Sequence, residues 1–354
     1  MATSGANQLV AWMEADNSIW AARVGPDGQP LDGRGTKLSS RYAWTAPRVE
    51  FDGRFYVVAW AQGAELVVSW IDPATGAVVA RRTRAEINNG QVALATTPEA
   101  AYIAWSDEKA EIRVLRIPND TRSMAGPSVV VSPDTGRNHA DPALSWNGST
   151  LLAVWTEIKT INSDPPFTTR ERLWAARVTP ELTLLDTPPL FIGDLPNVNE
   201  GAPSVASNGI DWLVVWDGER AGIRARRVLH DGRLEEYQPT ILTAGFLPAV
   251  AWDGVRYALV WEDAWHNSVN YGQRALRIGS IPAEGPLGVT FGAGIASLDA
   301  YPNAPPAITR AGDGRVVVAY TRVSFVPEHG GVERAFLRFI DTSTSGPRKR
   351  RSAR

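Results

Sequence analysis

An apolar segment that ends in an aromatic residue recurs seven times along this chain of 354 residues. The repeated aromatic residues are Trp12, Trp60, Trp105, Trp155, Trp216, Trp261 and Tyr320. Their spacing runs from 45 to 61 residues, a period near 45 with insertions. A unit of this length cannot shelter its apolar faces alone, so it has to stack against copies of itself. The repeat therefore predicts an array of like modules, although the length alone suggests two or three domains.

A glycine stands seven positions before most of these aromatic residues, as at Gly53, Gly148, Gly209 and Gly254. Asp or Asn precedes each of these four glycines, and such pairs favour tight two-residue turns with positive φ. Each copy is therefore expected to hold a hairpin, with a short strand A before the turn and strand B after it. Strand B, as in FYVVAW, is apolar on both faces and needs cover from both sides.

A third strand, strand C, follows strand B and carries arginine followed by an apolar residue in six copies. These pairs are Arg23-Val24, Arg116-Ile117, Arg177-Val178, Arg227-Val228, Arg277-Ile278 and Arg338-Phe339. Strand D is less regular and is visible in PSVVVS and LGVTFG. No apolar period of 3.6 residues is sustained, so almost no helix is expected. These patterns predict an all-β fold, a seven-bladed β-propeller of four-stranded antiparallel blades.

The expected domain is a single propeller over residues 1–344. Its blades are placed at about 1–44, 45–89, 90–139, 140–200, 201–245, 246–303 and 304–344. The chain starts inside strand A of blade 1, and nothing after residue 340 resembles a fourth strand for blade 7. We therefore expect an incomplete closing seam between blades 1 and 7, with exposed strand edges and lower stability. Residues 345–354 are expected to form a basic disordered tail, or alternatively a tail that docks on an acidic partner.

The repeat resembles the degenerate propeller repeats of bacterial cell-surface and extracellular proteins, written P-x-V-A-x-x-G-x-x-Y-L-V-V-W. The resemblance covers nearly the whole chain. It implies the propeller fold and an extracellular or cell-envelope location. It does not imply one activity, because propellers serve as hydrolases, lyases, lectins and protein scaffolds.

Composition excludes several classes of function. The chain has no cysteine, so it forms no disulfide framework, thiolate metal site or thiolate nucleophile. No apolar run is long enough for a transmembrane segment. The formal net charge is -2, and five cationic residues of the tail leave -7 for the body, so specific nucleic-acid binding is not expected. Gly-rich phosphate loops, H-E-x-x-H and G-x-S-x-G motifs are absent from the sequence.

The strand order places the B–C and D–A connections on one end of the propeller, here called the top face, and the A–B and C–D turns on the bottom face. Insertions after Trp155, Trp261 and Tyr320 are expected to form long loops on the top face, a usual place for binding. The expected ligand-binding residues, on the neighbouring blades 6 and 7, are Trp265, His266, Asn267, Tyr271, Tyr301, Phe325 and His329. The D–A connections add Tyr42, Trp44, His139, Asp194, Asn199, Asp299 and Asn303.

Aromatic rings beside Asn, Asp and His suit the recognition of sugars or peptides. The alternative is that these rings only pin loops onto the blade tops. We therefore expect a non-enzymatic recognition or scaffold domain that presents its top face to a protein or glycan. No catalytic residue, metal ligand or required cofactor is assigned, and the sequence carries no indication of the oligomeric state.

Acidic residues also follow the repeated aromatic residues, and they are Glu14, Asp107, Glu157, Asp217, Glu219, Glu262 and Asp263. A ring of free carboxylates at the channel mouth would suit a Ca²⁺-dependent hydrolase or lyase, which is the alternative function. We expect these carboxylates instead to pair with the strand C arginines across blades, because both features recur in most copies.

Overall fold

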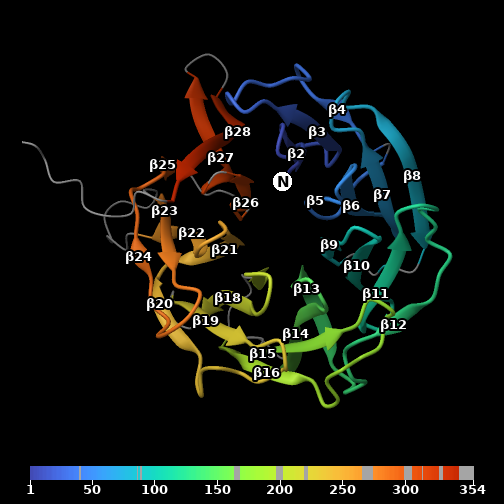
Figure 1. The fold of residues 1–354 in the computed structure, drawn as a ribbon, viewed down its shortest axis with the longest axis vertical. Coiled ribbons are helices and arrows are strands. Elements are labelled where there is room, and N and C mark those ends of the chain that lie inside the picture. Colours follow the sequence, from blue (N-terminus) through green and yellow to red (C-terminus); the bar gives the residue numbers. More distant parts are fainter. Residues whose placement is uncertain are drawn as a thin grey trace, which may run out of the picture.

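Seven antiparallel sheets stand around a central channel in the computed structural model, and the chain follows the ring once from blade 1 to blade 7 (Figure 1). The structure describes residues 1–39, 41–85, 87, 90–162, 168–196, 202–218, 222–264, 274–298, 305–312, 314–326 and 330–342. Over these ranges the regular structure is all β, without a helix. The predicted seven-bladed β-propeller is confirmed.

The strands of blades 1 to 4 are β1 (Ala2–Thr3), β2 (Gln8–Met13), β3 (Ile19–Val24), β4 (Thr36–Lys37), β5 (Arg48–Phe51), β6 (Tyr56–Gln62), β7 (Glu65–Ile71), β8 (Val78–Ala85), β9 (Val92–Thr96), β10 (Ala100–Ser106), β11 (Ile112–Pro118), β12 (Ser128–Val130), β13 (Asn138–Trp146), β14 (Leu151–Asn162), β15 (Thr168–Val178) and β16 (Leu190–Pro196). The strands of blades 5 to 7 are β17 (Ser204–Ser207), β18 (Trp212–Gly218), β19 (Gly222–Val228), β20 (Thr240–Ala244), β21 (Phe246–Trp252), β22 (Tyr257–Ala264), β23 (Arg274–Ile281), β24 (Thr290–Phe291), β25 (Ala296–Leu298), β26 (Ala307–Gly312), β27 (Arg315–Val326) and β28 (Gly330–Asp341).

Each blade is a meander in which strand A lines the channel and the last strand forms the outer rim (Figure 1). Blades 1 to 5 have four strands each. In blade 6 the short strand β25 also pairs with β23, and blade 7 has three strands within the described ranges. No segment of the described chain qualifies as a membrane-spanning helix.

The A–B turns form where the glycines stand, but the predicted two-residue length is wrong: four residues separate the paired Phe51 and Tyr56, and likewise Trp146 and Leu151. Gly53, Gly148 and Gly209 take φ of 91°, 100° and 95°, a region in which other residues are strained. The preceding Asp or Asn contributes its side chain rather than a positive φ of its own. Oδ1 of Asp52, for example, accepts hydrogen bonds from the N–H groups of Arg54 (2.8 Å) and Phe55 (2.6 Å). Asn147, Asn208 and Asp253 bind their turns in the same way.

Strand B is apolar on both faces because it packs against two neighbouring blades. In β6, Tyr56, Val58 and Trp60 pack toward blade 1, while Val57 and Ala59 pack toward blade 3. In blades 2 to 6 the repeated aromatic residue packs toward the preceding blade, as Trp105 does against blade 2, Trp155 against blade 3, Trp216 against blade 4 and Trp261 against blade 5. Each module therefore completes its core only with its neighbour.

The seam between blades 7 and 1 is different. Six apolar clusters join consecutive blades from 1 to 7, and the described residues form no seventh cluster between blades 7 and 1. The ring still closes there, because β1 contacts both β26 and β5. Trp12, at the repeat position of blade 1, is partly exposed, whereas its counterparts in blades 2 to 6 are fully buried. The expected incomplete seam is confirmed in the described residues.

The strand C arginines join blades on the bottom face. Arg177 forms an ion pair with Asp186 (2.7 Å), nine residues ahead in the C–D turn, and donates to the carbonyl of His230 (2.6 Å) in the C–D turn of blade 5. Arg23 pairs with Asp32 and reaches the carbonyls of Pro73 and Ala74 in blade 2. We call this arrangement the arginine clasp.

The third clasp joins blades 5 and 6 and is the most buried. Arg227 pairs with Glu236 (3.1 Å) and Glu235 (3.0 Å) and donates to the carbonyls of Pro282 (2.8 Å) and Gly285 (2.7 Å). In the clasp of blade 1, Asp32 holds the position that Glu236 holds here. Burial by itself would raise the pKa of Asp32, but the hydrogen bonds from Arg23 together have the larger effect and lower that pKa. The acids after the repeated aromatic residue were the expected partners of these arginines. That expectation is wrong for Arg23, Arg177 and Arg227.

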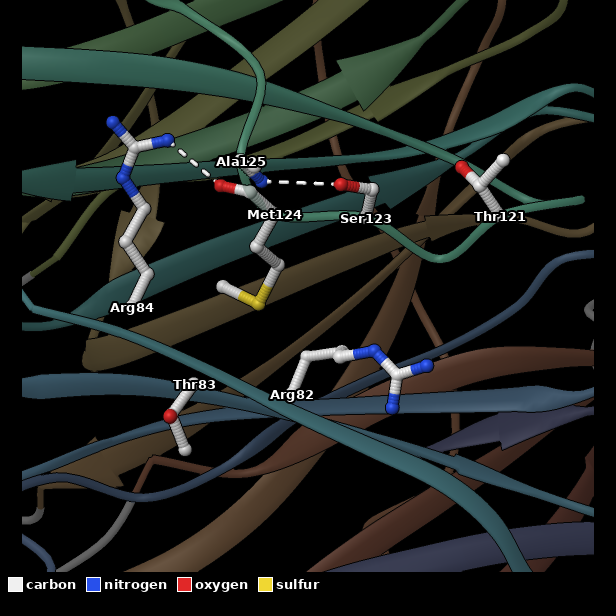
Figure 2. A pocket seen from close by; sticks show the side chains of 7 residues that line it. All are labelled: Arg82, Thr83, Arg84, Thr121, Ser123, Met124 and Ala125. Carbon is white, nitrogen blue, oxygen red and sulfur yellow. Dashed lines mark hydrogen bonds between the residues drawn. The ribbon is translucent and has the colours of Figure 1, made fainter.

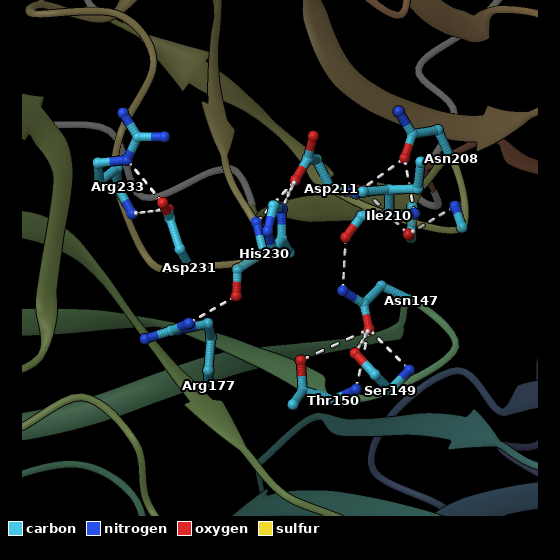
Figure 3. A network of polar contacts seen from close by, with 12 residues as sticks. Asn147, Ser149, Thr150, Arg177, Asn208, Ile210, Asp211, His230, Asp231 and Arg233 are labelled. Carbon is cyan, nitrogen blue, oxygen red and sulfur yellow. Dashed lines mark hydrogen bonds and ion pairs between the residues drawn. The ribbon is translucent and has the colours of Figure 1, made fainter.

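Neighbouring A–B turns on the bottom face are also tied together (Figure 3). Asn147 of blade 4 donates from Nδ2 to the carbonyl of Ile210 in blade 5 (2.5 Å). Asp211 accepts the N–H of His230 (2.7 Å) and lies 3.1 Å from its Nδ1. The polar groups of this face hold blades together.

Two of the three insertions expected to be top-face loops are mostly strand. β14 and β15 continue beyond the Trp155↔Trp174 pair to Asn162↔Thr168, and β27 and β28 continue beyond Tyr320↔Phe336 to Val326↔Gly330. Both segments contain alternating β-branched residues, which favour an extended hairpin. The B–C hairpins of blades 4 and 7 therefore extend their sheets at the top face.

Candidate functional site

The ligand-binding residues expected on blades 6 and 7 are not placed by the structure. Trp265, His266, Asn267, Tyr271, Tyr301 and His329 lie outside the described residues. Phe325 belongs to β27, where it pairs with Gly331, and its side chain is outside the description. That part of the site stays a prediction.

Most of the acids that follow the repeated aromatic residues make local contacts, and Glu219 lies outside the described residues. Asp107 pairs with Arg113 (2.5 Å), Glu157 with Arg137 (2.5 Å) and Asp263 with Arg277 (3.1 Å). Only Arg277 among these partners is a repeated strand C arginine, and it belongs to the same blade as Asp263.

Two more of these acids bind other groups. Asp217 accepts the N–H of Leu247 (3.0 Å), and Glu14 accepts the indole N–H of Trp12 (2.6 Å). Burial opposes ionisation of Asp107, yet the hydrogen bond from Arg113 lowers the pKa of that carboxyl. No group of three His, Asp or Glu side chains in the described ranges is arranged to hold a metal ion.

A separate pair of carboxyls lies on the strands that line the channel. Protein atoms surround Glu50 of β5, and this desolvation raises its pKa to about 7 against the effect of the N-terminal amine. Burial also raises the pKa of Asp141 on β13, against the effect of Arg48. Arg48 donates to the carbonyl of Val92 (3.1 Å) and to Oε1 of Gln91 (3.1 Å).

An exposed aromatic pair stands on the top face, in the D–A connection between blades 1 and 2. The rings of Tyr42 and Trp44 meet edge to face with centroids 5.0 Å apart and planes at 69°. Tyr42 is 54% exposed and Trp44 is 47% exposed, although large aromatic side chains gain much by burial. The two rings therefore form a small apolar platform that faces solvent.

The backbone, rather than the rings, fixes this connection to the blades. Ala43, between the two aromatic residues, is 1% exposed and packs in the core between blades 1 and 2. Its N–H donates to the carbonyl of Asn17 (2.8 Å), and the N–H of Trp44 donates to the carbonyl of Ala61 (3.2 Å). Ala43 also forms a β-bridge with Gln62. The backbone of this connection is thus held by contacts of its own, while about half of each ring remains open to solvent.

Polar groups flank the platform. Asn17, whose carbonyl binds Ala43, takes a positive φ of 58°, and its side-chain amide makes no hydrogen bond to any described residue. Asp16 beside it accepts hydrogen bonds from Ser18 and lies 3.3 Å from Nζ of Lys37, and these contacts lower its pKa. Arg41, which precedes Tyr42 in the chain, is exposed. The sequence identified Tyr42 and Trp44 as candidate binding residues, but it did not indicate that their rings are exposed.

Comparison with known proteins supports the fold. No family model matches this chain, and no curated protein matches it in sequence. A candidate 6-phosphogluconolactonase from Bacteroides fragilis is similar in structure, with a TM-score of 0.55 and 13% identity over 96% of this chain and 99% of that one. A puromycin hydrolase is similar with a TM-score of 0.56 and 16% identity over 97% of this chain and 52% of that one, so this chain spans about half of that protein. At these identities the similarity shows the fold alone.

Proposed function

We propose that this propeller is a non-enzymatic recognition domain that binds a glycan on its top face. The observation that carries the proposal is the exposed Tyr42 and Trp44 pair on a connection whose own backbone holds it in place. A rigid aromatic platform loses little conformational entropy on binding, so it is suited to recognition.

Glycan is favoured over protein by the size and surroundings of this platform. A stable protein interface buries about 800 Å² on each partner and has an apolar centre. Here the two rings have polar neighbours: Arg41 precedes Tyr42 in the chain, and the carbonyl of Asn17 accepts the N–H of Ala43 between the rings. One apolar face with hydrogen-bonding groups at its edge matches a sugar ring, which has C–H groups on its face and hydroxyls around its rim.

The pairing of the top-face acids supports recognition over hydrolysis. Asp107, Glu157 and Asp263 each hold an arginine, so they do not form the ring of free carboxylates that a Ca²⁺-dependent hydrolase or lyase would need. We further propose that the chain acts outside the cell or in the cell envelope, where glycans are displayed. Cell fractionation tests this location.

Replacing Trp44 by alanine should weaken glycan binding at least about tenfold, equivalent to about 1.4 kcal/mol, because the larger ring of the platform is lost. A glycan array probed with the intact chain identifies the ligand, and titration calorimetry compares the variants. Tyr237→Ala is the matched control, since Tyr237 is a 91% exposed ring on the outer rim of blade 5, away from the top face. Retained binding by Trp44→Ala, or no bound glycan together with Ca²⁺-dependent cleavage of one, would contradict the proposal.

A further inference from the structure

A hollow of about 590 Å³ lies between the outer strand of blade 2 and the C–D connection of blade 3 (Figure 2). One wall is β8, the outer strand of blade 2, with Arg82, Thr83 and Arg84. The other wall is the C–D connection of blade 3, with the hydroxyls of Thr121 and Ser123. The docking of two blades thus brings together residues about 40 positions apart in the sequence.

The wall contributed by blade 3 is held in place by cations of both blades. Arg84 donates from Nη1 to the carbonyls of Met124 (2.9 Å) and Gly126 (2.7 Å). The guanidinium of Arg122 lies over the ring of Phe55, at 4.6 Å, and near that of Trp70, at 5.9 Å. These contacts fix the hollow before any ligand arrives.

The arginine and hydroxyl side chains that line the hollow can all donate hydrogen bonds to a ligand. The carbonyls of Met124 and Gly126 already accept hydrogen bonds from Arg84. The acid nearest in sequence, Asp120, accepts the N–H of Thr121 (2.6 Å). Arg82 donates only to the carbonyl of Arg81 (2.8 Å) and has no carboxylate partner in the described chain. Within the described part of the chain, the hydroxyls of Thr83 and Thr121 make no hydrogen bond. The hydroxyl of Ser123 accepts one hydrogen bond, from the N–H of Ala125 (3.3 Å).

The charge of this region departs from that of the rest of the molecule. The body of the chain carries a net charge of -7, because the tail holds five of the cations in a chain whose total is -2. β8, with the sequence VVARRTRA, places three arginines on eight residues of an outer strand. Arg82 and Arg84 line the hollow, whereas Arg81 donates to the hydroxyl of Ser69 in its own blade and Arg122, on the facing wall, stacks on the ring of Phe55. A cationic hollow on an acidic body attracts anions selectively.

We propose that this hollow, here called the rim site, binds a phosphate or sulfate monoester group carried on a sugar-sized molecule. A guanidinium and several hydroxyls are the donors that proteins commonly offer to tetrahedral oxyanions. The volume lies within the range of small-molecule sites and exceeds what an inorganic ion fills, so the ester's carrier has room as well. The rim site does not depend on Tyr42 or Trp44.

The test titrates the intact chain with galactose 6-phosphate, galactose 6-sulfate, inorganic phosphate and, as the uncharged control, galactose. We expect the esters to bind and Arg82→Gln to weaken them at least about tenfold, with affinity falling as NaCl is raised. Arg233→Gln, which changes an exposed arginine of blade 5, and Trp44→Ala should bind as the parent does. Arg82 is exposed, so an unchanged melting temperature should accompany its loss of binding.

The comparison of ligands identifies the source of the oxyanion. Tighter binding of the esters than of inorganic phosphate supports a sugar ester, and equal binding supports a site for the free ion. Equal affinity of Arg82→Gln and the parent, binding of galactose as tight as its esters, or no binding of any anion would overturn the rim site. Preference for an oligonucleotide over the sugar esters would overturn the assignment of its ligand.

Discussion

Trp216→Ala should lower the free energy of unfolding by about 3 to 5 kcal/mol, the range for removing a large aromatic side chain from a core. Trp216 is completely buried and packs among residues of blades 4 and 5, including Val154 and Leu173. The surroundings are tight, since a methyl group placed on Gly193 would lie 2.8 Å from the indole ring. The cavity left by alanine would therefore lie at the contact between two modules.

Trp12→Ala is the matched control, because Trp12 holds the same repeat position in blade 1. It is partly exposed at the seam and belongs to none of the six interblade clusters, so its loss should cost less than half as much. Urea unfolding followed by circular dichroism measures both variants. Equal losses for Trp12→Ala and Trp216→Ala would contradict the account of the seam.

Arg227→Ala should also cost about 3 to 5 kcal/mol, for an electrostatic reason. Arg227 is buried, and its removal leaves the largely buried Glu236 without its cation and two carbonyls of blade 6 without their donor. Breaking a buried ion pair by removing one partner is costly because the other charge stays desolvated. The loss should appear in the contact between blades 5 and 6.

The control for the clasp is Arg233→Ala, in the same C–D turn. Arg233 pairs with Asp231 at 2.6 Å, but its side chain is 75% exposed, so the pair is screened by water and its loss should leave the melting temperature unchanged. Thermal unfolding of Arg227→Ala and Arg233→Ala under the same conditions compares their melting temperatures. A clasp variant as stable as Arg233→Ala would show that Arg227 does not hold blades 5 and 6 together.

The repeat made most of the fold predictable from the sequence. Apolar strands such as Tyr56 to Trp60 and the glycines with positive φ are local features, so their spacing predicts the blades. The clasp also had a visible signal that was missed, because Arg23 and Asp32, Arg177 and Asp186, and Arg227 and Glu236 are all nine residues apart. The acids nearest the repeated tryptophan, such as Asp107 and Glu157, pair instead with Arg113 and Arg137.

The sites were harder to predict because they depend on how separate segments dock. The sequence pointed to Tyr42 and Trp44 but could not show that burial of Ala43 would leave both rings in solvent. The rim site joins Arg82 to Thr121 and Ser123, which belong to different blades and share no local pattern. The three arginines of VVARRTRA were the available signal for it.

Hydrogen exchange along the whole chain, read by peptide mass spectrometry, tests most directly whether this protein is a closed ring of seven modules with one weak junction. The structure predicts that strand B of blades 2 to 6, namely β6, β10, β14, β18 and β22, exchanges at a common slow rate, and that β2 and β27 exchange faster beside the seam. Uniform protection across all seven blades would contradict the weak junction. A sharp boundary dividing the chain into two independently exchanging halves would contradict the ring itself.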